Sequence, residues 1–479
     1  MLSTWLDDTQ TWAEPASLSS FQRAIPLEWI SQVLESTNKA SIRKRKLPAE
    51  LVVWLIVGMG LYRDRPITDV VTKLDLVLSS QEGDTLAASS IAQARQRLSE
   101  EPLRELFTLT AGHWTQQEDK DDLWHGLRLF AVDGTLFRTP DTPELADHFE
   151  YIKHRPDRHT EYPMVRLCAL MSLRSRLIHD VKFGPANTGE VSYAKQLSPQ
   201  VQSLTLFDRC YLSAELLINW QHRQQDAHWL VPLKGNTKYR IVETFGEGDH
   251  LVEMQVSPHA RKQDSSLPEN WQARLIECEG ESGDYKGFIT SLTEPEQYPA
   301  EALRYVYQER WSIENGYGEL KQFQLSTATL LRSQKVSGIY QEIWGLLTGY
   351  NLIRMEMSQI AREAKVAPLR ISFVMAMRLI QDELIWCSLS KPGTIPTKLK
   401  KMRENVKQFI LPEKRKRPKK RTVRIPKTQY PVRSNHLKCT VLAIVRLCYL
   451  PTQGRSGGCP PSTSITTSTA AAPPNSFGA

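Results

Sequence analysis

Features that mark disulfide-bonded and zinc-binding proteins are scarce in this sequence. Its seven cysteines, at positions 168, 210, 278, 387, 439, 448 and 459, are odd in number, widely scattered and without a C-x-x-C pair. Disulfide scaffolds and structural zinc sites both need cysteines in recurring close spacings. The sequence therefore argues against either arrangement and favours a protein of the reducing cytosol.

Long apolar runs are also missing, which bears on membrane insertion. The most apolar stretch, Leu51 to Tyr62, has about twelve residues, whereas a helix needs about 20 residues to cross a bilayer. The acidic beginning MLSTWLDDTQTW has no basic flank followed by an apolar run, so we expect no signal peptide. We therefore expect no contact with a membrane, and a buried helix at 51–62.

The positive charge of the chain is concentrated in one segment. The 479 residues are 41% apolar and 24% charged, which is ordinary for a globular protein, and the net charge is +8. Residues 414–427 (KRKRPKKRTVRIPK) hold nine Lys and Arg and no acid. This run is either a solvated tail or an arm that adds salt-dependent affinity for DNA. From 451 onward Ser, Thr, Pro, Ala and Gly dominate, so we expect a disordered tail.

The first part of the chain has a helical pattern over residues 26–117. Arg95 and Arg97 fall on one short helix together with two glutamines, and RKRK at 43–46 forms a basic loop. Arginine and glutamine side chains suit contacts with phosphates and base edges. We interpret 1–118 as an all-α DNA-binding domain that uses both arginines, and the alternative is a helical bundle with a few exposed arginines.

Beyond this domain the pattern changes to strands, two of which end in an aspartate. GLRLFAVDGT ends a buried strand near Asp133, and SLTLFD ends another at Asp208. Runs at 164–173 and 176–184 predict a hairpin that continues the same sheet. Short alternating runs over 237–293 then predict a β-rich region, after which the helical pattern resumes.

The stretch YVYQERWSIENGYGELK, at 305–321, gathers one acid, two cations and a phenol. If this stretch is an α-helix, four of its side chains share an arc of about 60°. They are Tyr307, Arg310, Glu314 and Lys321. The simpler alternative is a surface helix with an ion pair between Arg310 and Glu314 at a spacing of four.

Together, Asp133, Asp208 and Glu314 form an oxygen-only set of ligands, which suits Mg²⁺ or Mn²⁺ better than Zn²⁺. Two such ions about 4 Å apart can activate an attacking hydroxyl and stabilise the leaving oxygen of a phosphodiester. Each acid alone is weak evidence, since a strand-end aspartate before glycine usually forms a turn. Arg310 and Lys321 would counter the charge of a bound phosphate backbone, so the set as a whole predicts phosphodiester chemistry.

The spacing of these residues resembles the tyrosine-arginine-glutamate-lysine signature of bacterial transposases of the "insertion sequence four" family, within the DDE superfamily. The signature is Tyr307, two residues, Arg310, three residues, Glu314, six residues and Lys321. VDGTLFRTPDTPE, LTLFDRCY, HWLVPLKG and RKRKLPAELVVWLIVGMGL also look like segments of this family. The resemblance covers the chain from about residue 25 to 435.

The resemblance implies an α/β fold with a ribonuclease-H-like catalytic core, formed by 119–236 and 296–395. A β-rich insertion at 237–295 would interrupt this core, and the helical domain would precede it. A basic segment at 396–450 and the disordered tail at 451–479 would complete the chain.

The family also implies roles for the site residues. Asp133, Asp208 and Glu314 would hold Mg²⁺ or Mn²⁺ ions. The side chains that would contact transposon-end phosphates or a flipped base are Tyr307, Arg310 and Lys321. Phe288 and Trp271 are candidates to stack on an extruded base, and filling of the core is the alternative role for both.

On this basis we expect a DNA transposase that binds the terminal inverted repeats of its element. It would cleave and join double-stranded DNA by a cut-and-paste reaction with two metal ions, and related members pass through a hairpin. It would act as a homodimer in the bacterial cytoplasm, associated with the nucleoid.

Two departures from the family pattern leave the activity of this copy open. Cys210 stands where the family usually has glycine, and it would be strained if that position needs a positive φ. Leu145 stands where an asparagine is common. The alternatives are a metal nuclease of the same fold without strand transfer, and a catalytically inactive DNA-binding relic or repressor.

Overall fold

The computed structural model describes residues 25–40, 47–74, 76, 86–116, 122–155, 158–277, 287–325, 331–388 and 395–412. The chain divides into two units, Met1–Glu413 and Lys414–Ala479, and all the described residues belong to the first. The expected basic loop at 43–46, basic run and tail therefore lie outside the described residues. No described helix has the length and apolarity needed to span a membrane.

The first part of the chain is helical, as the sequence predicts. Its described helices are α2 (Leu27–Ser36), α3 (Ala49–Leu61), α4 (Ile67–Lys73), α5 (Ala88–Leu98) and α6 (Glu101–Gln116). Every residue of α3 from Leu51 to Leu61 is buried. A helix that is apolar on all sides is stable only inside a core.

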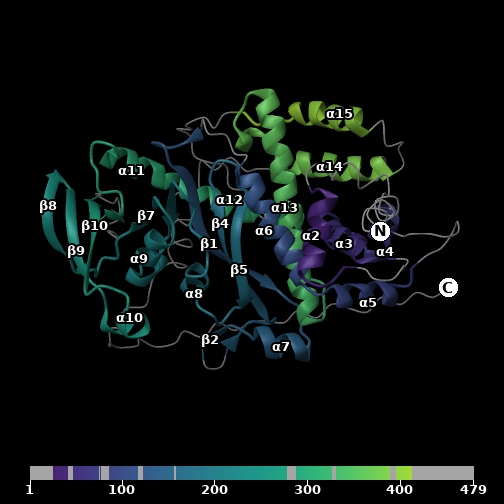
Figure 1. The fold of residues 1–479 in the computed structure, drawn as a ribbon, viewed down its shortest axis with the longest axis horizontal. Coiled ribbons are helices and arrows are strands. Elements are labelled where there is room, and N and C mark those ends of the chain that lie inside the picture. Colours follow the sequence, from purple (N-terminus) through teal and green to yellow (C-terminus); the bar gives the residue numbers. More distant parts are fainter. Residues whose placement is uncertain are drawn as a thin grey trace, which may run out of the picture. The chain divides into compact units, whose positions relative to one another are not determined.

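The partner that covers α3 comes from the far end of the chain. It is α13 (Val336–Ala364), and the two helices touch at Gly60 and Gly345, where neither residue has room for a side chain. In Figure 1, α13 runs between the helices α2 and α3 and the strands of the sheet. The N-terminal helices, α13 and one face of the sheet thus share a single hydrophobic core.

One nine-stranded sheet organises the rest of the molecule. Its order is β5-β4-β1-β6-β7-β11-β10-β9-β8. The first five strands in this order are β5 (Ile178–Pro185), β4 (Met164–Ser172), β1 (Arg128–Arg138), β6 (Ser203–Phe207) and β7 (Ala227–Pro232). The predicted hairpin is β4 and β5, which pair antiparallel, while β1, β6 and β7 run parallel.

The strands predicted over 237–293 extend this same sheet. They are β8 (Arg240–Gly246), β9 (Asp249–Gln255), β10 (Asn270–Glu277) and β11 (Gly287–Thr290), with the short helix α10 (Pro258–Gln263) between β9 and β10. Because β11 pairs antiparallel with β7, the chain returns to the central strands before the last helices begin. β8 forms the far edge of the sheet, at the left of Figure 1.

The two faces of the sheet are covered by different helices. Side chains alternate along a strand, so Leu129 and Ala131 of β1 join the core with α3, α6 and α13. Phe130 and Val132 join a second core with α9 (Ala214–Arg223) and with Tyr193 of α8 (Glu190–Ala194). The helices α14 (Phe373–Ser388) and α15 (Ile395–Lys407) follow α13, and α14 contacts it.

Candidate active site

Strand register brings the two predicted aspartates together, although β1 does not end at Asp133 as the sequence predicts but continues to Arg138. The parallel pairing of β1 with β6 ends where Val132 lies opposite Phe207. The next residues are Asp133 and Asp208, so the acids hold matching positions on neighbouring strands, which lie about 4.8 Å apart. Since β6 ends at Phe207 while β1 continues to Arg138, both acids lie where the sheet opens.

The segment with the third acid crosses these strand ends and is bonded to both. The Tyr307 hydroxyl donates to the backbone oxygen of Phe207 at 3.1 Å. The Tyr317 hydroxyl donates to the backbone oxygen of Asp133 at 2.6 Å. These two bonds hold the segment over the residues that carry the aspartates.

The segment is not the single regular helix that the sequence predicts. It consists of α11 (Ala300–Tyr307), a 3-10 turn (Gln308–Arg310), α12 (Trp311–Gly318) and a π-helical turn (Glu319–Gln324). Within the π-helical turn, the carboxylate of Glu319 is buried and bound by Arg176 at 2.5 Å and by Arg354. Lys321 lies in the π-helical turn, and its Nζ donates to Thr135 Oγ1 at 3.1 Å, two residues after Asp133 on β1.

The guanidinium of Arg310 lies among the three acids. Its Nη2 donates to Glu314 Oε1 at 3.1 Å, and its Nη1 is 4.0 Å from Asp133 Oδ2. Burial alone would lower the pKa of Arg310. The pKa is nevertheless raised, because the interactions with Tyr307, then Asp208 and then the other two acids favour the charged guanidinium. Its Nε is buried and has no hydrogen-bond partner among the described residues.

Asp133 is the acid most affected by its surroundings. Burial raises its pKa from 3.8 to about 6, and the charges of Glu190 and Glu314 act in the same direction. The backbone N–H of Gly134, which donates to Asp133 Oδ1 at 2.9 Å, and the charge of Arg310 oppose this shift. A carboxyl group with this pKa gains from a cation that replaces its proton.

The three acids offer the donors that a divalent cation needs. They provide carboxylate oxygens alone, the ligands preferred by Mg²⁺ and Mn²⁺. As they stand, no three His, Cys, Asp or Glu side chains in the described ranges are close enough to hold one ion. The carboxylates surround Arg310 instead, so a metal ion would have to take over the role of this cation.

Comparisons with known proteins identify the family of the chain. The family described as "Insertion element 4 transposase N-terminal" matches residues 15–108, and the one described as "Transposase DDE domain" matches residues 124–352. The chain is 35% identical over 417 residues to "Transposase InsG for insertion sequence element IS4" of Escherichia coli (strain K12), which covers 86% of this chain and 93% of that protein. The chain belongs to the IS4 family of DDE transposases. It is therefore an enzyme, and the family predicted from the sequence is confirmed.

Two further similarities extend over parts of the transposase. "Putative transposase InsZ" of Escherichia coli (strain K12) is 36% identical over 232 residues, which are 48% of this chain and 76% of that protein. The cryo-EM structure of the piggyBac transposase synaptic complex with hairpin DNA covers 84% of this chain and 86% of its own, with 13% identity and a TM-score of 0.39.

Arg95 of the transposase has partners inside the protein. Its guanidinium donates to Gln341 Oε1 at 3.3 Å, to Ser333 Oγ at 3.1 Å and to the backbone oxygen of Gly338 at 3.3 Å. The sequence predicts that Arg95 contacts DNA. In the structure, its side chain joins α5 to the start of α13. Arg97, by contrast, is exposed on α5.

The two aromatic candidates for base stacking lie in hydrophobic clusters. Phe288 is 6% exposed, and its ring centroid is 4.6 Å from that of Tyr307. Trp271 is partly buried, and its ring centroid is 5.7 Å from that of Trp229. Both positions match the alternative role of filling the core.

The two departures from the family pattern are accommodated. Cys210 is exposed in the 3-10 turn Arg209–Tyr211 and is not among the residues with a positive φ. The backbone strain that a positive φ would cause at this position is therefore absent. Leu145 lies in α7 (Pro143–Phe149), fully buried in the main core. An apolar side chain suits that position.

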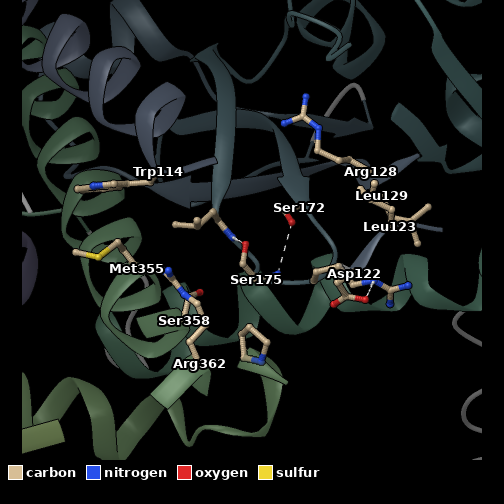
Figure 2. Close-up of a pocket in the computed structure, with 13 residues that line it drawn as sticks. Trp114, Asp122, Leu123, Arg128, Leu129, Ser172, Ser175, Met355, Ser358 and Arg362 are labelled. Atoms are coloured by element: carbon tan, nitrogen blue, oxygen red, sulfur yellow. Dashed lines mark hydrogen bonds and ion pairs between the residues drawn. The ribbon is translucent and has the colours of Figure 1, made fainter. Parts of the chain in front are cut away.

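A small cavity lies near the start of β1, away from the acids. It measures about 60 Å³ and includes Arg128 and Leu129 at the start of β1 and Ser172 at the end of β4. Figure 2 shows its lining, with the Ser175 N–H directed at Ser172 Oγ, 3.5 Å away. Since Leu129 precedes Asp133 by four residues, the cavity is roughly 13 Å along the strand from the acids and is not part of their site.

Sequence reasoning missed two residues near the acids. Tyr317 lies in the predicted stretch, but its bond to the backbone of Asp133 depends on how the helix crosses the sheet. Glu190, the first residue of α8, follows the glycine at its N-cap and carries no motif of its own. Only the folded chain brings its charge near Asp133.

Proposed function

We propose that this IS4-family transposase cuts and joins DNA at the ends of its insertion sequence, with Asp133, Asp208 and Glu314 as the catalytic acids. The observation that carries the proposal is the position of these three carboxylates around Arg310 at the open end of β1 and β6. The sheet order β5-β4-β1-β6-β7, with parallel β1, β6 and β7, is consistent with a ribonuclease-H-like core.

The same three acids would hold two divalent ions, Mg²⁺ or Mn²⁺. When bound, such ions activate an attacking hydroxyl and stabilise the leaving oxygen of a phosphodiester. The protein fixes the positions of the acids through backbone register for Asp133 and Asp208. It fixes Glu314 through the hydrogen bonds of Tyr307 and Tyr317 to the same two strand ends.

Three cationic or phenolic side chains beside the acids would bind the DNA backbone. Arg310 has a buried Nε–H that finds no acceptor in the described part of the chain, and a phosphate oxygen can satisfy it. Burial and the charge of Arg138 lower the pKa of Lys321, which favours its pairing with an added negative charge. We assign the DNA contacts of the site to Tyr307, Arg310 and Lys321.

The N-terminal helices would bind the terminal inverted repeats. Among the two arginines predicted for this role we retain Arg97, because it is exposed on α5. Two element ends must be paired before cut-and-paste joining, so we propose that the transposase acts as a homodimer on double-stranded DNA.

The substitution Glu314→Gln tests the catalytic assignment. It removes one negative charge and keeps the shape of the side chain, so we expect cleavage of labelled element ends with Mg²⁺ to be lost while end binding in a mobility-shift assay persists. Glu301→Gln is the matched control, because Glu301 lies on α11 with its side chain 93% exposed. Cleavage by Glu314→Gln at the wild-type rate would refute the assignment.

Supplying cleaved donor ends and a target plasmid distinguishes the alternatives. A transposase yields joined products, and a nuclease of the same fold yields only cut DNA. An inactive relic or repressor binds the ends without cutting them, even in the wild-type protein.

A further inference from the structure

A fourth carboxylate lies next to the proposed catalytic acids. Glu190 begins α8, and its carboxylate occupies the space directly over Gly134 of β1. A Cβ atom on Gly134 would lie 1.5 Å from Glu190 Oε1 and 2.4 Å from Cδ. The absence of a side chain at position 134 therefore creates the place in which this carboxylate sits, one residue after Asp133.

Glu190 approaches from the opposite face of the sheet to Glu314. Side chains alternate along β1, so Gly134 faces the core with α8 and α9, while the side chain of Asp133 faces the other way, toward Arg310. Within the described residues, β1 has no paired neighbour on the β6 side beyond Val132. The edge of β1 on that side is therefore not covered by a strand at this point, and the charge of Glu190 acts on Asp133.

The contacts of Glu190 with the rest of the protein do not compensate this charge well. Its ion pair with Arg166 has an Nη1 to Oε2 distance of 3.7 Å, which is long for a charge-assisted hydrogen bond. The Nε of Arg166 donates elsewhere, to the backbone oxygen of Ala186 at 3.1 Å. A partly buried carboxylate beside a second one and with a loose partner is costly unless a further cation joins them.

We propose that Glu190 is a fourth carboxylate of the metal site, which binds a divalent ion together with Asp133. The proposal rests on the proposed function, since it needs a metal site at Asp133. It gives Gly134 a specific role as well, because any side chain there would displace the Glu190 carboxylate.

Calorimetric titration of the DNA-free protein with Mn²⁺ tests the proposal. We expect Glu190→Gln to weaken Mn²⁺ binding by about ten- to hundredfold, the range found when groups around a metal are removed. Glu215→Gln is the matched control, because Glu215 lies on the same side of the sheet and pairs with Lys195 at 2.6 Å, away from Asp133. This control should bind Mn²⁺ as the wild type does.

Thermal denaturation in EDTA separates this role from a purely structural one. If Glu190 served only to pair with Arg166, Glu190→Gln and Arg166→Gln would both lower the melting temperature, and Mn²⁺ affinity would stay unchanged in both. We expect instead that Glu190→Gln melts at or above the wild-type temperature, because the repulsion of Asp133 is relieved.

Gly134→Ala provides a second variant that keeps the charge of Glu190 and moves it. We expect its Mn²⁺ affinity to fall as in Glu190→Gln. Wild-type Mn²⁺ affinity in Glu190→Gln, with weakened binding in Glu314→Gln, overturns the proposal and leaves the three-acid site intact. Wild-type affinity in both variants overturns the metal site and the proposal together.

Discussion

The crossing of α3 and α13 predicts that Gly60→Ala destabilises the transposase. A Cβ on Gly60 would lie 2.6 Å from the backbone oxygen of Gly345 and 2.9 Å from the Cα of Leu346. These are backbone atoms, so the two helices must move apart by several tenths of an ångström along a buried interface. Overpacking of this kind costs about 1–3 kcal/mol or more. Alanine in place of glycine inside a helix returns about 1 kcal/mol, so the net loss is about 0–2 kcal/mol.

Gly112→Ala is the matched control for this prediction. Gly112 lies inside α6, and a Cβ there would meet nothing within 4 Å. The same chemical change should therefore stabilise the protein by up to about 1 kcal/mol. Denaturation by urea, followed by circular dichroism, measures both effects. Equal stabilisation by the two substitutions would refute the close approach of α3 and α13.

Three further predictions concern the site and its support. Burial raises the pKa of Asp133 from 3.8 to about 6. Ionisation of Asp133 therefore destabilises the metal-free fold, and this destabilisation disappears at low pH, where the carboxyl group is protonated. Asp133→Asn should thus be more stable than wild type in EDTA near pH 8, by up to about 3 kcal/mol, with the gain vanishing near pH 4. Equal gains at both pH values would contradict this. Glu319→Gln leaves the buried guanidinium of Arg354 without its carboxylate, so we expect a loss of about 3–5 kcal/mol in urea denaturation; a loss below 1 kcal/mol would argue against the buried cluster. Cys210→Gly should lower the stability in urea by about 0.4–1 kcal/mol, because Cys210 has no positive φ to relieve. A gain in stability would mean that the backbone there is strained.

The parts of the fold that depend on local pattern could be predicted from the sequence. Alternation and apolar runs identify the strand that carries Asp133, the strand that precedes Asp208, and the hairpin of β4 and β5, but they place the end of the first strand too early. The spacing of Tyr307, Arg310 and Glu314 identifies the segment that crosses them. Each of these signals lies within about ten residues of chain, where periodicity is informative.

The parts that depend on distant partners could not be predicted. In the π-helical turn Glu319 meets Arg176 and Arg354, which are far from it in the sequence. Arg95 has the composition of a DNA contact, yet its partner Gln341 lies about 246 positions away. Local sequence does not reveal which of two possible acceptors, a phosphate or another helix, such an arginine meets.

The shared core of α3 and α13 limits what shortened copies of this gene product can become. A polypeptide that stops before Val336, as after a premature stop codon, keeps all the N-terminal helices but lacks the helix that buries α3. Its exposed apolar surface would favour aggregation or proteolysis over a stable end-binding fragment. We therefore do not expect truncated copies to inhibit transposition by binding the element ends. A full-length copy that has lost its activity through a point substitution is better able to bind them.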